Sequence, residues 1–218
     1  NHHGRDLILK ARQLGFTTFE MIDSLDDCLF IPDFNAGCIC HNLDSAKDIF
    51  RNKIKFAYNA ITDDQKAILA DIGYKLRRPT SDKGNAYVFD NGSAIKVSTS
   101  YRGDTLQRLH VSEFGKICKK YPEKAKEIVT GAFEAVPADG GIITLESTAE
   151  GKEGYFYKYS ELARKAKELN KKLSQENKTY SKISFTILHY LILYKLLKNS
   201  LGDVEFLLDN LTYGYVQS

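Results

Sequence analysis

Three short polar stretches in this chain each follow an apolar run, and the first has the residue types of a phosphate-binding loop. Residues 10–18 read KARQLGFTT and follow the apolar residues 7–9. Such a loop needs backbone N–H groups at a helix N-terminus, a cation for phosphate oxygens and a hydroxyl for Mg²⁺. The stretch offers a turn-permitting glycine, hydroxyl groups and positive charge: Gly15, Thr17 or Thr18, and Lys10 with Arg12. Against the pattern GxxxxGK[ST], Lys10 replaces a glycine and Phe16 replaces the lysine, so this stretch alone is better explained as a basic strand-to-helix turn.

The second stretch, residues 106–113, reads LQRLHVSE and has the form of a strand that ends in an acidic residue. P-loop ATPases keep a Mg²⁺ ligand and the group that orients the attacking water at such a position. The usual pair is Asp-Glu, whereas this chain has Ser112-Glu113. Glu113 can act as a general base, and Ser112 can meet a metal only through its hydroxyl or a water. A polar strand end without catalytic role is the alternative.

The third stretch, residues 142–151, reads IITLESTAEG, an apolar run followed by small hydroxyl residues. Hydroxyls at a strand end can sense the terminal phosphate of a nucleotide, here Ser147 and Thr148. Gly151 and Gly154 would let the following segment move. The alternative is an ordinary strand-to-helix loop.

The pattern of apolar residues and turn signals predicts the elements that position these stretches. Asn91-Gly92 between two β-prone runs is a strong hairpin signal. Ser45-Ala46-Lys47-Asp48 resembles a capping box and predicts a helix that starts at Ser45. Residues 63–78 are expected to be partly helical. Strands are predicted at residues 7–9, 37–40, 86–90, 93–99, 106–111 and 142–145, with helices from Ser45, over 122–136 and over 155–173. This alternation predicts an α/β fold with a mostly parallel sheet flanked by helices.

The composition is that of an ordinary folded protein. Of 218 residues, 43% are hydrophobic, 27% are charged and only 4 are proline, which excludes disordered, collagen-like and low-complexity chains. The 4 cysteines have no CxxC spacing, which indicates a reduced, intracellular compartment. His189 and Lys195 interrupt the longest apolar segment, residues 183–197, so we expect a buried helix or strand there and no membrane span. The first residues do not resemble a targeting signal, and we expect the chain to start inside a longer protein.

Positive charge is concentrated toward the C-terminal part of the chain. The net charge is only +3, but residues 152–182 hold nine Lys or Arg against four Glu, a local charge of +5. A basic helix can bind a polyanion. The alternative is a solvated helix face, which is what most charge runs are.

Together, and in this order along the chain, the three stretches resemble the ATPase half of the large terminase subunit, the DNA-packaging motor of tailed bacteriophages. The resemblance covers roughly residues 5–160. Residues 10–17 resemble a terminase Walker A variant with R-Q-x-G, in which the lysine stands at the start of the loop. Residues 109–115 resemble the Walker B strand with its catalytic glutamate, and residues 146–151 resemble the motif that couples hydrolysis to movement.

The resemblance implies a P-loop NTPase-like sheet with a β-hairpin insertion, ATP and Mg²⁺ as cofactors, and a set of site residues. Glu113, Arg12 and Arg102 would be catalytic, with Arg102 as an arginine finger on a neighbouring subunit's nucleotide or, alternatively, a plain surface arginine. The nucleotide would be bound by Lys10, Gln13, Gly15, Thr17 and Thr18, and Mg²⁺ by Thr17 and, through water, by Ser112. Hydrolysis would be coupled to movement by Ser147, Thr148, Glu150 and Gly151. DNA would be bound by Lys165, Lys171 and Lys172.

The resemblance also implies partners and a domain division. Double-stranded DNA, a homo-oligomeric ring, a portal protein and a small terminase subunit would be partners in the host bacterial cytoplasm, with no membrane. We expect an ATPase core over residues 1–173, incomplete at its N-terminus, and a divergent tail over residues 174–218. The only acidic residues after 182 are Asp203, Glu205 and Asp209, so no nuclease is expected. An inactive or truncated prophage remnant that binds nucleotide or DNA, and a helicase-like P-loop ATPase, remain as alternatives.

Overall fold

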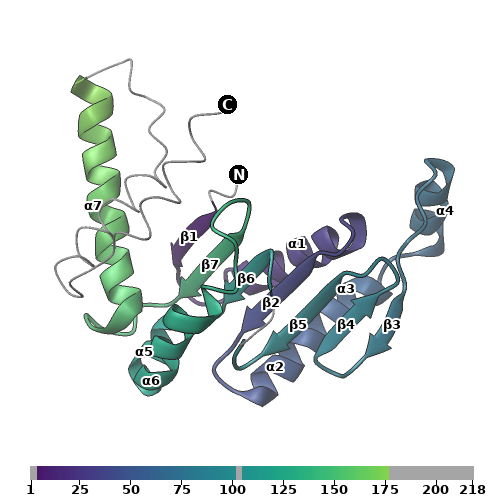
Figure 1. Cartoon of the computed structure of the whole chain (residues 1–218), viewed down its shortest axis with the longest axis horizontal. Coiled ribbons are helices and arrows are strands. Elements are labelled where there is room, and N and C mark those ends of the chain that lie inside the picture. Colours follow the sequence, from purple (N-terminus) through teal and green to yellow (C-terminus); the bar gives the residue numbers. More distant parts are fainter. Residues whose placement is uncertain (1–3, 102–104, 177–218) are drawn as a thin grey trace. The chain divides into compact units, whose positions relative to one another are not determined.

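The computed structural model describes residues 4–101 and 105–176 (Figure 1), with side chains described up to Leu169. Its contacts divide the chain into two compact units, Asn1–Lys158 and Tyr159–Ser218, and the helix α7 (Gly154–Glu176) spans that boundary. The apolar segment at residues 183–197 lies outside the described residues. Within the described part, no helix combines the length and the apolar character that a membrane crossing requires.

A seven-stranded sheet organises the first unit, in the order β1-β7-β6-β2-β5-β4-β3 (Figure 1). Its strands are β1 (Arg5–Leu9), β2 (Asn35–Ile39), β3 (Pro79–Asp82), β4 (Ala86–Phe89), β5 (Ala94–Ser98), β6 (Arg108–Val111) and β7 (Ile142–Ser147). The pairs from β1 to β5 are parallel, and β4 and β3 join antiparallel. This confirms the predicted α/β fold and the hairpin, in which Gly92 takes a φ of 84°. β3 was not predicted.

The helices follow the predicted order, except that the structure adds an unpredicted helix over residues 114–120, directly after β6. They are α1 (Phe16–Phe30), α2 (Leu43–Ile49), η1 (Phe50–Lys55), α3 (Phe56–Asn59), α4 (Asp63–Asp71), α5 (Phe114–Lys120), α6 (Pro122–Glu127), η2 (Ile128–Ala132) and α7. The predicted start at Ser45 is wrong, because Asn42 caps α2 and accepts a hydrogen bond from the Ser45 amide at 2.8 Å. The predicted helix over 122–136 contains the π-helical segment η2, although its apolar face, including Ala125 and Ile128, is buried as expected.

The strand register assigns the buried side chains to two faces of the sheet. Residues paired across parallel strands point to the same side, so Cys38, His110 and Thr144 share one face. Helix α1 covers this face, because the Arg108 guanidinium pairs with Asp23 and Asp27 of α1. We call it the α1 face. The opposite face packs against α5, and both faces end at the same carboxyl edge of the parallel strands, where α/β sheets bind ligands.

Candidate active site

Side chains from three strand ends meet at the carboxyl edge of β1, β7 and β6. Lys10 follows β1, and its Nζ lies 3.6 Å from Glu113 Oε1 and 3.6 Å from Glu146 Oε2. Thr17, in the first turn of α1, donates a hydrogen bond to Glu146 Oε1 at 2.6 Å. The structure therefore brings together the lysine, the hydroxyl and the glutamate that the sequence motifs single out, and it adds a second glutamate.

The loop between β1 and α1 is shaped for a bound anion. Its start is fixed by the Lys10 amide, which donates to the Ser147 carbonyl at 3.0 Å. Gln13 and Gly15 have φ of 61° and 76°, so the chain turns tightly before α1 begins. No side chain caps α1 and no acidic residue lies in its first turn. The N–H groups of that turn, which lack helical partners, and the positive end of the helix dipole are therefore available at the site.

Glu113 is held in an unusual backbone conformation between β6 and α5. Its φ of 55° and ψ of 42° are left-handed, a region that non-glycine residues rarely occupy and that is common at functional sites. Its side chain is 31% exposed and directs Oε1 toward Lys10, whose side chain is 7% exposed. A carboxylate with this access can contact both solvent water and a ligand held by Lys10.

Glu146, near the end of β7, was missed as a site residue. Its side chain is fully buried on the α1 face, and Oε1 accepts hydrogen bonds from Thr17 and from Ser112 Oγ, the latter at 3.0 Å. Burial alone would raise its pKa, but His110, Thr17 and Lys10 together lower the pKa of Glu146 to about 2. It is therefore ionised at neutral pH. The sequence signal that could have identified Glu146 is its charge, which stands near the end of a largely apolar run.

Lys53 is a second missed residue. It belongs to η1 and donates from Nζ to the Thr18 hydroxyl at 2.6 Å, so it adds a cation beside the loop between β1 and α1. The hydrogen bond spans 35 positions in the chain. Nothing in the local sequence of this helix distinguishes Lys53 from its neighbouring lysines, so no sequence signal could have identified it.

The proposed coupling residues extend from β7 toward α5. Ser147 is fully buried on the face opposite Glu146, where its Oγ lies close to Gly115 of α5. Thr148 donates to Glu150 at 3.3 Å, and Glu150 lies 3.9 Å from Lys119 at the end of α5. A chain of contacts therefore connects the end of β7 with the helix that follows Glu113.

The remaining predicted site residues are exposed, lie outside the described residues, or have side chains that are not described. The side chains of Arg12 and Gln13 are exposed, and Gly151 has a φ of 120°. Arg102 lies outside the described residues. In α7, Lys165 is exposed, whereas the side chains of Lys171 and Lys172 are not described.

The donor set of this cluster suits Mg²⁺ bound to a nucleotide. Mg²⁺ prefers oxygen ligands, and in phosphate sites it needs only one or two from the protein. Thr17, Ser112 and Glu146 place two hydroxyls and a carboxylate together, and Glu146 Oε2 is buried without a hydrogen-bond partner among the described residues. Those residues hold no group of three His, Cys, Asp or Glu side chains arranged to bind a metal. Such a group is what a site built from protein ligands alone would need.

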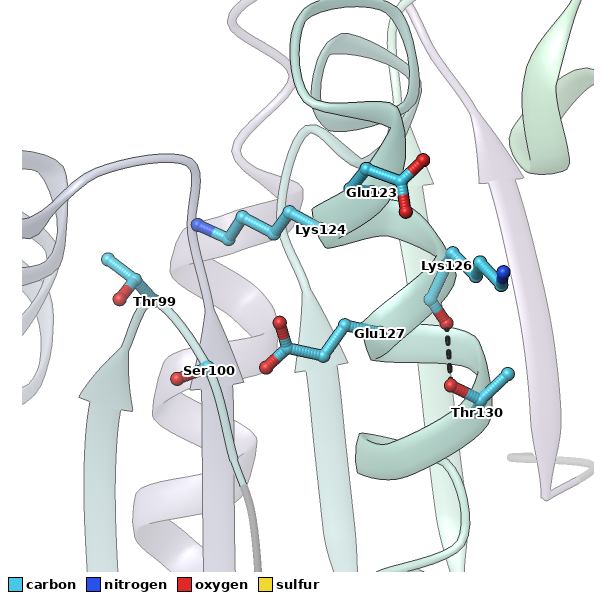
Figure 2. A pocket seen from close by; sticks show the side chains of 7 residues that line it. All are labelled: Thr99, Ser100, Glu123, Lys124, Lys126, Glu127 and Thr130. Atoms are coloured by element: carbon cyan, nitrogen blue, oxygen red, sulfur yellow. Dashed lines mark hydrogen bonds between the residues drawn. The ribbon is translucent and has the colours of Figure 1, made fainter.

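A separate cavity, lined by residues that follow β5 and by residues of α6 and η2, contains none of the cluster's side chains (Figure 2). It has a volume of about 620 Å³ and is lined by Thr99, Ser100, Glu123, Lys124, Lys126, Glu127 and Thr130. Lys124 donates to the carbonyls of Cys40 and His41, at 3.1 and 3.2 Å, just after β2. Burial, followed by the charges of Lys116, Lys124 and Lys120, lowers the pKa of His41. Several lysines therefore lie close enough to His41, which follows β2, to disfavour its protonated form.

Neither a protein-family model nor a curated protein sequence matches this chain. Among solved structures, it is similar to the large terminase from the thermophilic bacteriophage D6E, with a TM-score of 0.43 and 13% identity over 72% of this chain and 35% of that one. It is also similar to the large terminase ATPase domain of Thermus phage P74-26, with a TM-score of 0.41 and 17% identity over 71% and 62%. The chain spans less than two thirds of the length of either protein. These proteins belong to the family that the sequence motifs resemble.

Proposed function

We propose that this chain is the ATP-hydrolysing core of a phage large terminase, which powers the packaging of double-stranded DNA into a procapsid. One observation carries the proposal. Lys10, Thr17 and Glu113, which come from the Walker A-like and Walker B-like stretches, lie together at one edge of a parallel sheet. Phosphoryl transfer needs this combination of a phosphate-binding cation, a metal-binding hydroxyl and a group that positions water.

The roles of the residues follow from their geometry. Lys10 is nearly buried between two carboxylates, and a triphosphate would present it with more negative charge than either glutamate does. Bound Mg²⁺ would neutralise charge on the phosphate oxygens through the oxygens of Thr17 and its neighbours. Glu113, the more exposed of the two glutamates, would accept a proton from the attacking water.

Hydrolysis would be coupled to movement through the contacts that leave β7. Loss of the terminal phosphate near Thr17 would be sensed by residues 147–151, and the link from Glu150 to Lys119 would pass the change to α5. Gly151, whose φ of 120° favours glycine, gives this segment its turn. Because α5 begins directly after Glu113, one helix would connect the hydrolytic residue with the moving segment.

The packaging role adds further proposals. Lys165, Lys171 and Lys172 of α7 would contact DNA phosphates in a sequence-independent and salt-dependent way. The functional assembly would be a homo-oligomeric ring with a portal protein and a small terminase subunit in the bacterial cytoplasm, with Arg102 reaching a neighbouring nucleotide. We place the ATPase core at residues 1–173, with residues 174–218 as a divergent tail without nuclease activity.

A second candidate is an inactive remnant that binds nucleotide or DNA without hydrolysis. Ser112 favours it, because the acidic residue that normally precedes the catalytic glutamate is absent. A helicase-like P-loop ATPase is the third candidate. Stimulation of hydrolysis by duplex DNA favours the terminase, and stimulation by single strands alone favours the helicase.

The test measures ATP hydrolysis with and without duplex DNA, together with nucleotide affinity, for Lys10→Ala and Glu113→Ala. We expect Glu113→Ala to lower turnover by about 10²–10⁴-fold and to leave nucleotide affinity largely intact. Lys10→Ala should lose affinity and turnover together. Lys83→Ala and Glu134→Ala, at exposed positions outside the cluster, are matched controls expected to behave as the wild type.

The outcomes separate the candidates. Nucleotide binding without turnover in the wild type would identify the remnant. Equal loss of affinity and turnover in Glu113→Ala would reject the role of Glu113 as base. A wild-type chain that folds but binds no nucleotide would reject the proposed function altogether.

A further inference from the structure

We infer that Glu146 supplies the carboxylate that holds the Mg²⁺ of the bound nucleotide, so that this role lies on β7 and not on the Walker B-like strand β6. The inference rests on the proposed function, since it concerns the metal of that same site. It assigns a metal-binding role to a residue that belongs to the coupling stretch 146–151 and received no role of its own in the sequence analysis.

The Glu146 carboxylate lies between the two motifs, within hydrogen-bond distance of a hydroxyl from each. On β6, the residue before Glu113 is Ser112, which has no negative charge. The Ser112 hydroxyl instead donates to Glu146 Oε1 at 3.0 Å, and the Thr17 hydroxyl donates to the same atom at 2.6 Å. A single carboxylate oxygen thus lies within hydrogen-bond distance of both hydroxyls that are candidates for the metal. Glu146, on the neighbouring strand β7, thus supplies the negative charge that Ser112 lacks on β6.

Burial of the Glu146 carboxylate also points to a ligand. Its side chain is fully buried, and a buried carboxylate is expensive unless its oxygens are well satisfied. Oε2 accepts no hydrogen bond from the described residues and has Lys10 Nζ at 3.6 Å. If Glu146 served only to pack the core, we would expect both of its oxygens to accept hydrogen bonds, whereas Oε2 accepts none and faces the ammonium group of Lys10. A ligand that arrives with the phosphate would satisfy it.

The strand order places Glu146 next to both motifs. β7 lies between β1 and β6 (Figure 1). Glu146 is paired with Ile8, two residues before Lys10. The Lys10 amide bonds to the Ser147 carbonyl, so the end of β1 is fixed against the residue that follows Glu146. Of the strands that carry the cluster, only β7 has both other strands as neighbours. A side chain near its carboxyl end can therefore contact residues of both motifs.

A structural role is the competing explanation, in which Glu146 serves only as the counterion of Lys10 and the anchor of Thr17. The two explanations differ in what metal-free nucleotide should do. A metal ligand contributes to metal affinity alone, and its charge beside Lys10 opposes a bound triphosphate. A structural anchor supports the shape of the loop, so its loss should weaken nucleotide binding with or without metal.

The experiment measures Mn²⁺ binding by electron paramagnetic resonance in the presence of a non-hydrolysable ATP analogue. Analogue affinity is measured separately in EDTA. The variants are Glu146→Gln, which keeps the shape and removes the charge, and the double variant Ser112→Asp with Glu146→Gln, which returns the carboxylate to β6. Glu153→Gln, at an exposed glutamate in the loop after β7, is the matched control. Thermal unfolding establishes that each variant is folded.

We expect Glu146→Gln to weaken Mn²⁺ binding by about 10–100-fold. Its analogue affinity in EDTA should be unchanged or higher, and the double variant should regain most of the Mn²⁺ affinity. Unchanged Mn²⁺ affinity in a folded Glu146→Gln protein would overturn the inference, as would parallel losses with metal and in EDTA. With either result, the proposed function would still hold as long as the wild type binds the analogue. A wild type that binds no analogue would remove both.

Discussion

The α1 face of the sheet consists of two halves that share one backbone register and differ in chemistry. One half, which we call the polar half, is contributed by β6 and β7: Arg108, His110, Ser112, Thr144 and Glu146. The other, the apolar half, is contributed by β2, β5 and β4: Ala36, Cys38, Ile95, Val97, Tyr87 and Phe89. All of these side chains are buried, so exposure to water does not explain the difference.

The two halves differ in how completely their buried side chains are packed or hydrogen-bonded. In the apolar half, Tyr87 contacts Phe50 and Phe89 edge-on, with ring centroids 4.9 and 5.8 Å apart. In the polar half, buried atoms of His110, Thr144 and Glu146 have no hydrogen-bond partner among the described residues. Lys10 Nζ lies 3.6 Å from Glu146 Oε2, so an ion pair holds this carboxylate where a hydrogen bond is absent. The apolar half therefore stabilises the sheet by packing, whereas the polar half depends on charge.

The largest effect that tests this division is expected from Phe89→Ala. Phe89 is 2% exposed and packs against Tyr58 and Tyr87, so its truncation leaves a cavity that should destabilise the protein by about 3–5 kcal/mol. Denaturant unfolding measures the loss, and Phe56→Ala, at a side chain that is 69% exposed, is the control. Nucleotide affinity per folded molecule should not change. A comparable loss of affinity would show that the two halves do not act separately.

A smaller effect is expected from the charge of Glu146, and it depends on pH. The folded protein holds the pKa of this carboxyl at about 2, below its ordinary value of 4.5. Ionised Glu146 therefore stabilises the fold at pH values above 4.5, and this contribution is lost as the pH falls from there toward 2. Urea unfolding of the wild type and Glu146→Gln should differ by about 3 kcal/mol at pH about 6 and by roughly 1–2 kcal/mol at pH about 3, because the contribution is lost fully only below pH about 2.

The control for the pH experiment is Glu134→Gln, which removes an exposed carboxylate. Its unfolding free energy should follow the wild-type curve at both pH values. An equal difference between the wild type and Glu146→Gln at both pH values would mean that the charge of Glu146 is not favoured by the fold. That result would also remove the contrast in electrostatics between the two halves.

The apolar half and the sheet class could be predicted because their signals are local. Asn91-Gly92 determines the hairpin by turn chemistry alone, and runs of apolar residues mark the strands. The loop from Lys10 and the position of Glu113 after a strand were found in the same way. The predicted helix start at Ser45 was wrong because the Asn42 side chain, three residues earlier, accepts the hydrogen bond of the Ser45 amide and so caps the helix itself.

The polar half could be predicted only in part because its residues meet through strand order. Nothing in the local sequence states that β7 lies between β1 and β6, so the approach of Glu146 to Lys10 was not visible. The same holds for Lys53, which reaches Thr18 from a distant helix. The motifs of a cluster assembled from three strand ends can therefore be predicted from the sequence, but its complete set of residues cannot.

The smallest effect concerns the turn that connects the hairpin to α1. Gly92 has a φ of 84°, and a methyl group there would collide with the Asp33 carboxylate. The turn also holds the C-terminal end of α1, since Asn91 Nδ2 donates to the Cys28 carbonyl at 3.0 Å and Ser93 Oγ donates to the Ile31 carbonyl at 2.7 Å. Gly92→Ala should therefore disturb α1 at the end remote from Thr17.

Gly84→Ala is the matched variant, because Gly84 has a φ of 76° with no atom within 4 Å of an added Cβ. It should lose about 1–2 kcal/mol of unfolding free energy from the left-handed backbone alone. Gly92→Ala should lose somewhat more, and the excess measures the contact with Asp33. Both variants should bind the ATP analogue like the wild type, because the N-terminal turn of α1 is held by Thr17 and Glu146. A weaker analogue affinity in Gly92→Ala but not in Gly84→Ala would show that α1 transmits strain from the hairpin to the site, and the division between the two halves would then be wrong.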